Sequence, residues 1–93
     1  MDAVTLSSVV EAKSEPLAAP LAGGLVILQV ETDRYYNLNE LGTEVWQLIQ
    51  QPVTVAEIVE RVTATHDVDA ARCEADILAL LQDMAQAQLI TVR

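Results

Sequence analysis

The spacing of hydrophobic residues changes along the chain and divides it into a strand-forming part followed by a helical part. Residues 1–23 show no helical period, and Pro16 and Pro20 interrupt any helix there. We expect one short strand and an irregular connection in this stretch. Residues 24–38 hold two runs of β-forming residues, 25–30 and 34–38, with a polar turn between them. This segment is predicted to form a β-hairpin.

Residues 39–88 follow a period near 3.6 and predict three helices. The first starts at an N-cap supplied by Asn37 or Asn39. The second starts at Thr54, which has the spacing to Glu57 of a capping box. The third and longest is capped by Asp69 and runs to about residue 86, before an extended tail at 89–92.

This order of elements predicts an α+β fold resembling a winged helix-turn-helix. A small three-stranded antiparallel sheet comes first, and three helices pack on one of its faces. We expect a single domain over residues 1–93, made of an N-terminal strand and connection (1–23), a β-hairpin (24–38) and the three helices (39–88). A sheet this small has a free edge that is available for pairing.

Composition narrows the class of partner. The formal charge of −9 repels nucleic-acid phosphates and anionic lipids, and the chain holds only two Tyr and one Trp for base stacking. No apolar run approaches the roughly 20 residues that cross a bilayer. A single cysteine and the absence of a signal-like N-terminus predict a cytoplasmic protein. Neither a nucleic acid nor a membrane is expected as a partner.

The inventory of reactive side chains is poor. One His, one Cys and one Lys give few combinations for nucleophilic catalysis, and the conceivable pair is Cys73 with His66. Cys73 shares a helical angle with apolar residues, which favours a buried structural thiol. No cluster has metal-ligand spacing, and Gly23 and Gly24 lack the further glycines of a phosphate-binding loop. We predict no metal, no cofactor and no enzyme activity.

The winged-helix order leaves a DNA-binding alternative in which the third helix reads the major groove. Residues 69–88, however, contain only one basic residue, Arg72. They contain four acidic residues, Asp69, Glu74, Asp76 and Asp83, so this helix would repel DNA phosphates. An acidic winged-helix regulator or protein-interaction domain remains the main alternative. An enzyme subunit that uses Cys73 is the third.

The segment 34–46, Arg-Tyr-Tyr-Asn-Leu-Asn-Glu-Leu-Gly-Thr-Glu-Val-Trp, resembles the signature of the PqqD-like family. Segments 52–59, 67–69 and 74–81 and the closing Leu89-Ile90 fit the same pattern, so the resemblance covers residues from about 24 to 92. The chain departs from it at Gln88, where the family commonly has Gly, which concerns the C-cap of the third helix.

The resemblance implies a bacterial recognition element for ribosomally made peptides, most similar to the free-standing proteins of lasso peptide biosynthesis. It implies that the leader of a precursor peptide pairs with the third strand of the sheet and lies in a groove against the third helix. It further implies presentation of the leader to a separate leader peptidase and to a cyclase.

The residue pattern agrees with this mechanism, because an edge strand at 34–38 would accept an extended peptide by β-strand addition. Projection of the third helix places Asp76 and Asp83 at the margin of its apolar face. The alternation along 34–38 leaves open which face of the strand lines the groove, and the same free edge could pair two copies into a homodimer. The candidate peptide-binding residues are Arg34, Tyr35, Tyr36, Asn37, Leu38, Cys73, Asp76, Ile77, Leu80, Asp83 and Met84.

Overall fold

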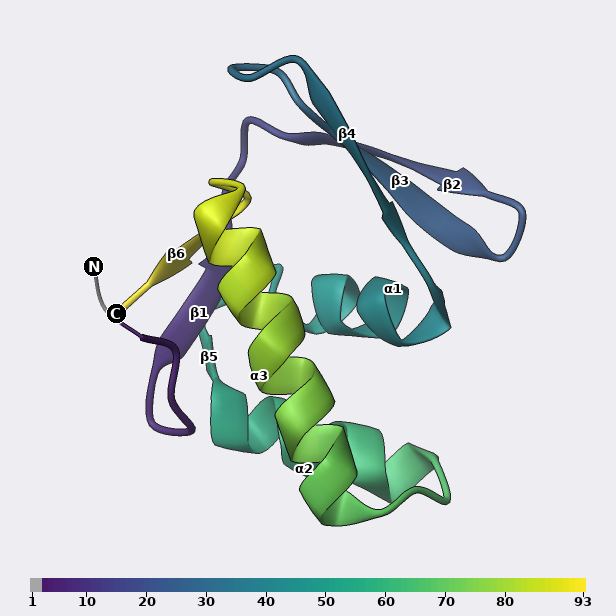
Figure 1. Ribbon diagram of the computed structural model, residues 1–93, viewed down its shortest axis with the longest axis vertical. Coiled ribbons are helices and arrows are strands. Elements are labelled where there is room, and N and C mark those ends of the chain that lie inside the picture. Colours follow the sequence, from purple (N-terminus) through teal and green to yellow (C-terminus); the bar gives the residue numbers. More distant parts are fainter. Residues whose placement is uncertain (1–2) are drawn as a thin grey trace.

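The computed structural model describes residues 3–93 and has an upper layer of strands above a layer of helices (Figure 1). Within these residues six strands and three helices occur. In chain order they are β1 (Val9–Ala12), β2 (Leu17–Leu21), β3 (Gly24–Gln29), β4 (Arg34–Leu38), α1 (Glu40–Leu48), β5 (Val53–Thr54), α2 (Val55–Thr65), α3 (Ala70–Gln86) and β6 (Ile90–Val92). The predicted α+β class and the order of strands before helices are confirmed.

The upper layer is an antiparallel sheet in the order β2-β3-β4. The predicted hairpin is confirmed as β3 and β4, in register with Ile27 opposite Tyr36. The expectation of an irregular connection was wrong for 17–21, because these residues form β2 with Pro20 inside it. Since β2 is an edge strand, a residue without an N–H is tolerated at its outer side. β4 is the other edge strand of this sheet, and its unpaired edge borders the candidate site described below.

Close backbone contacts hold the end of β4 in place. A Cβ atom on Gly24 would overlap the carbonyl oxygen of Leu38, and a Cβ on Gly42 would lie 3.1 Å from the Cβ of Leu38. Glycine at both positions therefore lets β3 and α1 approach Leu38 closely. The approach positions the C-terminal end of β4 directly over the start of α1.

A second antiparallel sheet joins distant parts of the chain in the order β5-β1-β6. Val10 of β1 lies opposite Val53 on one side and Val92 on the other. A hydrogen bond from the N–H of Lys13 to the Leu89 carbonyl (2.9 Å) continues this contact beyond the strands. This sheet anchors the end of α3 against the N-terminal segment, as Figure 1 shows at the left of the molecule.

All three predicted helix starts are confirmed. The side chains of Asn39, Thr54 and Asp69 accept hydrogen bonds from backbone N–H groups two or three residues later, at 2.9, 3.2 and 3.1 Å. These contacts satisfy N–H groups that lack a partner inside the helix. Of the two candidates for the first cap, the structure selects Asn39.

The C-terminus of α3 ends in a Schellman motif centred on Gln88. The N–H of Leu89 donates to the carbonyl of Met84 (2.9 Å) and the N–H of Gln88 to that of Ala85 (3.1 Å). Gln88 adopts φ 62°, the left-handed conformation that favours glycine. The glutamine thus occupies the geometry expected for the glycine of the family pattern.

The core lies between the sheet β2-β3-β4 and the helices. Trp46, Ile49, Ile77 and Leu81 are buried there beneath Ile27 of β3. Within residues 3–93 no helix combines the length and the apolar character needed to cross a membrane. Met1 and Asp2, which the sequence assigned to the N-terminal segment, lie outside the described residues.

Candidate functional site: a groove between β4 and α3

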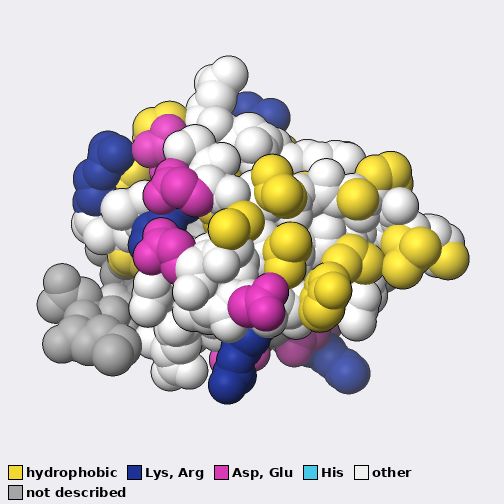
Figure 2. Space-filling model, turned by 90° about the horizontal axis from the view of Figure 1, so that it is seen from above, with side chains coloured by type: hydrophobic (Ala, Val, Ile, Leu, Met, Phe, Trp, Pro, Cys, Tyr) yellow, Lys and Arg dark blue, Asp and Glu magenta, His cyan; other side chains and the backbone are white. Residues whose placement is uncertain are grey.

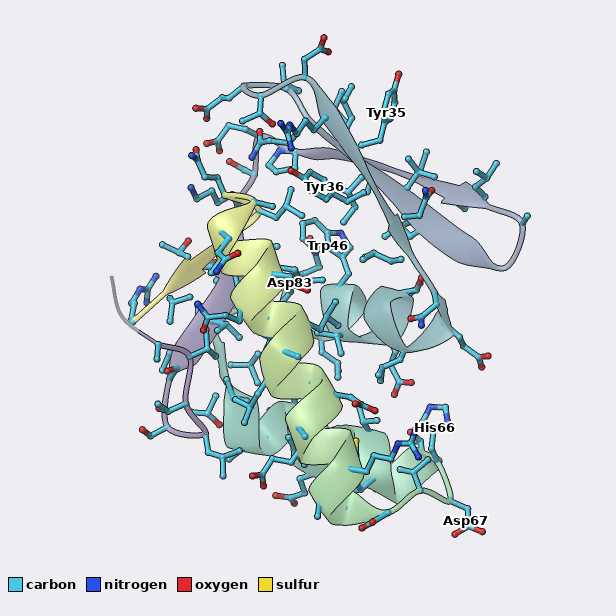
Figure 3. All side chains as sticks on the ribbon, viewed as in Figure 1. Tyr35, Tyr36, Trp46, His66, Asp67 and Asp83 are labelled. Atoms are coloured by element: carbon cyan, nitrogen blue, oxygen red, sulfur yellow. The ribbon has the colours of Figure 1, made fainter. Side chains whose placement is uncertain are left out.

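A groove of about 550 Å³ runs between the edge strand β4 and the C-terminal half of α3. Figure 3 shows Tyr35 and Tyr36 on the strand side and Asp83 on the helix side. We call this hollow the strand–helix groove. Its lining consists of Tyr35, Tyr36, Asn37, Leu38, Leu80, Asp83, Met84, Ala87 and Leu89.

The strand side of the groove has one buried and one exposed face. Leu38 is buried and Tyr36 is half-buried against the core, whereas Tyr35 is 73% exposed. Because side chains alternate along a strand, Tyr36 and Leu38 face the helices, and Tyr35 and Asn37 face outward. Residues of both faces border the groove, because Tyr35 and Asn37 line it together with Tyr36 and Leu38.

The helix side supplies an apolar floor and an acidic margin. Met84 is buried, Leu80 is half-buried and Asp83 is exposed. The helical projection from the sequence predicted this arrangement, with Asp83 at the margin of the apolar face, next to Leu80, and Met84 just inside it. A ligand in the groove would meet methyl and thioether groups below it and a carboxylate at its side.

The backbone of β4 is the most distinctive part of the groove. Among the described strands, β4 pairs with β3 alone, so its second edge faces the groove. In an edge strand every other residue directs its N–H and C=O away from the sheet. These groups form a row of donors and acceptors with the spacing of an extended peptide.

Four residues that the sequence assigned to the same site do not line the groove. Ile77 is fully buried in the core and has no surface to offer a ligand. Cys73 and Asp76 line a separate pocket one to two helical turns nearer the start of α3. Arg34, at the beginning of β4, is exposed beside the groove and is not part of its lining.

Two groove residues escaped the sequence reasoning. Ala87 and Leu89 close the end of the groove beyond Met84. Ala87 follows Met84 by three residues, so the helical period could have identified it. Leu89 could not be found in this way, because its position depends on the left-handed turn at Gln88.

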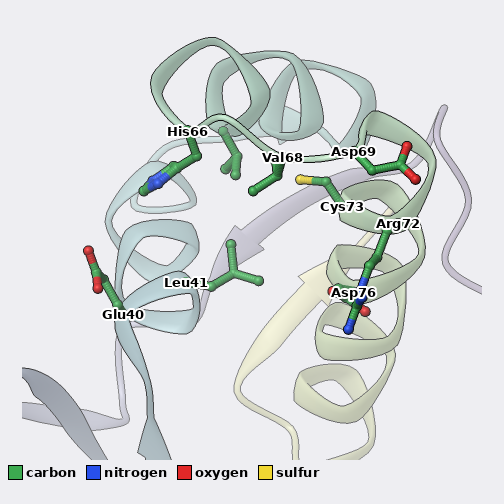
Figure 4. Close-up of a pocket in the computed structure, with 9 residues that line it drawn as sticks. Glu40, Leu41, His66, Val68, Asp69, Arg72, Cys73 and Asp76 are labelled. Carbon is green, nitrogen blue, oxygen red and sulfur yellow. The ribbon is translucent and has the colours of Figure 1, made fainter.

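The separate pocket, of about 310 Å³, lies between the start of α1, the α2–α3 connection and the first half of α3 (Figure 4). We call it the α1–α3 pocket. It is lined by Glu40, Leu41, Val62, His66, Val68, Asp69, Arg72, Cys73 and Asp76.

Cys73 and His66 share this pocket without forming an activated pair. Burial, together with the carboxylates of Asp76 and Glu44, raises the pKa of the Cys73 thiol. The Nε2 atom of His66 lies 2.6 Å from Oε1 of Glu44, so the imidazole is engaged elsewhere. A raised thiol pKa is the opposite of what a nucleophilic cysteine requires. In residues 3–93 no group of three potential metal ligands comes together.

The outward face of the sheet β2-β3-β4 is unusually apolar. Leu17 of β2, Leu28 of β3 and Tyr35 of β4 lie opposite one another in register and form one row across this face. Leu17 and Leu21 are each 61% exposed. Figure 2 shows hydrophobic side chains gathered over this part of the molecule. Contiguous exposed apolar surface of this kind marks interaction sites.

Comparison with known proteins gives one family and several similar structures. Residues 24–90 match the family model described as coenzyme PQQ synthesis protein D (PqqD). No curated protein matches the chain in sequence.

Three solved structures share the fold over most of both chains. TbiB1 in complex with the TbiA(beta) leader peptide has a TM-score of 0.77 at 25% identity, covering 86% of this chain and 93% of that one. Lasso peptide synthetase B1 complexed with the leader peptide has a TM-score of 0.76 at 21% identity, covering 88% and 96%.

The third is the solution structure of the PqqD truncation of PqqCD from Methylobacterium extorquens. Its TM-score is 0.80 at 27% identity, covering 96% of this chain and 95% of that one. It is described as a functional, stand-alone recognition element for ribosomally synthesized and post-translationally modified peptides.

Proposed function

The chain belongs to the PqqD family, and from this premise we propose that it binds the leader region of a ribosomally made precursor peptide, most specifically that of a lasso peptide. The leader adds a strand to the free edge of β4 and lies in the strand–helix groove. Two of the similar structures hold leader peptides, and one of them, at 25% identity, supports the transfer of this role.

The observation that carries the proposal is the free edge of β4 opposite an apolar helix face. An extended peptide can satisfy the N–H and C=O groups of the edge, while its alternate side chains enter the hollow against Leu80 and Met84. Backbone pairing gives affinity and the hollow gives selectivity. Neither an acidic regulator nor a Cys73 enzyme makes use of this arrangement.

The proposal assigns binding and presentation to this chain and leaves catalysis to other proteins, in the bacterial cytoplasm. A separate leader peptidase and a cyclase act on the bound precursor. The outward face of the sheet, with Leu17 and Leu21 exposed, is the surface on which we expect one of these enzymes to dock. Because Leu17 and Leu21 do not line the groove, peptide and enzyme can occupy the chain together.

The free edge also supports self-association when no peptide is present. Two β4 strands pairing antiparallel would satisfy the same N–H and C=O groups. Since both partners compete for one edge, peptide binding should dissociate such a homodimer. Sedimentation velocity with and without the leader peptide measures this: persistence of a dimer in saturated complex would exclude the β4 edge as its interface.

The proposed function is tested by fluorescence anisotropy with a labelled synthetic leader, copied from the short precursor reading frame beside the gene. Saturable binding is expected for the wild-type chain. Leu80→Glu places a carboxylate on the apolar floor and should weaken binding at least about tenfold. Circular dichroism establishes that the variant is folded.

Ala79→Glu is the matched control, because it adds the same charge at an exposed neighbour of Leu80 on α3. Ala79 does not line the groove. It should bind within about twofold of wild type, as surface substitutions generally do. Equal loss in both variants would locate binding outside the groove. No binding by the wild-type chain at high micromolar concentration would overturn the function itself.

A further inference from the structure

The α1–α3 pocket is built from an apolar floor with an acidic rim. Leu41, Val62 and Val68 supply aliphatic groups, and Val68 is 51% exposed at the mouth. Three exposed carboxylates, Glu40, Asp69 and Asp76, line the rim with one exposed cation, Arg72, so the carboxylates are in excess. Figure 4 shows Leu41, Val68 and Cys73 gathered at its centre.

With about 310 Å³ the pocket lies at the small end of ligand sites, so it suits one or two side chains.

The pocket continues the strand–helix groove along the same face of α3. Cys73 and Asp76 line the pocket, and Leu80 and Asp83 line the groove. Successive spacings of three, four and three residues place these four side chains on one stripe of the helix. At its other wall the pocket begins at Glu40, two residues after the last residue of β4. A peptide leaving the edge of β4 at that end arrives at the pocket.

The two hollows are separated by a distance that an extended peptide spans in a few residues. Asp76 and Asp83 differ by seven positions, which is roughly 10 Å along a helix. An extended chain covers this in about three residues. One continuous peptide can therefore reach both hollows without a turn.

From these relations we propose that the α1–α3 pocket is a second subsite for the same peptide. It takes an aliphatic side chain flanked by a lysine or arginine, about three residues from the residue held in the strand–helix groove. The apolar floor receives the aliphatic group, and Glu40 and Asp76 attract the neighbouring cation. This inference rests on the proposed function and adds the chemistry of the ligand to it.

The apolar part is tested by closing the mouth of the pocket with Val68→Trp. Its matched control is Val30→Trp in the β3–β4 turn, which has a similar exposure of 54% and does not line either hollow. Both variants are titrated with the labelled synthetic leader and with a series shortened by one residue at a time from each end. Val68→Trp should weaken binding by about ten- to a hundredfold, the effect of losing one buried aliphatic side chain.

A double-mutant cycle connects the pocket to one peptide residue. The truncation that removes the aliphatic residue should weaken binding to wild type and to Val30→Trp, and have little further effect on Val68→Trp. If Val68→Trp binds like wild type while Leu80→Glu does not, the second subsite is excluded and the proposed function stands. If neither the wild-type chain nor any variant binds the leader, the second subsite and the proposed function are both excluded.

The charged part is tested with two double variants of equal net charge. Glu40→Gln with Asp76→Asn removes two of the rim carboxylates, and Glu31→Gln with Glu60→Gln removes two exposed carboxylates that line neither hollow. The rim variant should weaken binding by about two- to fivefold more than the control at low salt, with the difference vanishing at high salt. Equal effects would exclude a flanking cation in the pocket.

Discussion

The side-chain amide of Gln29 donates a hydrogen bond of 2.7 Å to the backbone carbonyl of Gln88 and so joins β3 to the end of α3. Gln29 is 1% exposed, and its Oε1 also accepts from the N–H of Glu31 at 3.2 Å. The two residues are 59 positions apart. Since the hairpin and the helix form the two walls of the strand–helix groove, this contact fixes their separation.

Replacing Gln29 by Leu should therefore destabilise the fold and widen the groove. The Gln88 carbonyl and the Glu31 N–H lose their partner, which costs about 1–3 kcal/mol in the free energy of unfolding. Urea denaturation measures this cost, and Gln47→Leu at an exposed position of α1 is the control. Equal stability of the two variants would show that the buried amide does not hold the walls together.

Gln88 itself offers a stabilising substitution. Its φ of 62° costs an L-residue roughly 1 kcal/mol, and Gln88→Gly removes this cost while keeping the carbonyl that Gln29 contacts. The free energy of unfolding should rise by up to about 1 kcal/mol, whereas Gln88→Val should lower it. A glycine variant less stable than wild type would contradict the Schellman geometry of this turn.

Cys73 should react slowly with alkylating agents. Burial first, then the carboxylates of Asp76 and Glu44, raise the pKa of the thiol, so the reactive thiolate is scarce at neutral pH. The stabilising effect of the protonated thiol is complete below the ordinary cysteine pKa and is lost as pH rises through the raised value.

The rate of iodoacetamide labelling, followed by mass spectrometry across pH in folded and denatured protein, measures this behaviour. The folded rate should rise at higher pH than the denatured rate. A folded protein that labels as fast as the denatured chain at pH 7 would return Cys73 to the set of candidate nucleophiles.

Peptide binding and enzyme docking should separate by mutation. Leu17→Asp on the outward face of β2 should leave leader affinity unchanged, because β2 is the far edge strand of the sheet and Leu17 does not line the groove. Cleavage of the precursor by its leader peptidase should slow at least about fivefold, the effect of losing one interface anchor. Leu6→Asp, at an exposed position outside the sheet β2-β3-β4, is the control. Unchanged cleavage in Leu17→Asp would move the docking surface elsewhere.

Local features of this fold could be predicted from the sequence because their causes are local. Asn39, Thr54 and Asp69 cap their helices through contacts within three residues, and the β3–β4 hairpin closes over a short turn. The sheet β5-β1-β6 was not predicted, because it pairs β1 with residues about 45 and about 80 positions away without a distinguishing pattern. β2 was not predicted because it contains Pro20. A proline indicates the end of a strand unless the strand is known to lie at the edge of a sheet.

The candidate site shows the same division. The helical period placed Leu80, Asp83 and Met84 on the side of α3 that lines the groove, whereas strand alternation alone did not tell which face of residues 34–38 points toward the helices. The helical period could not tell that Ile77 faces inward, nor that Cys73 and Asp76 belong to a second hollow. Those distinctions depend on where α1 and the α2–α3 connection lie beside α3, which only the folded chain determines.

The most direct measurement of strand addition at β4 is an N-methyl scan of the synthetic leader. Each peptide N–H is replaced in turn by N-methyl, and the affinity for the wild-type chain is measured. An added strand predicts that binding is lost at every second residue over the five-residue length of β4, because alternate N–H groups donate to the edge. Losses at every third or fourth residue, or at none, would contradict pairing with β4.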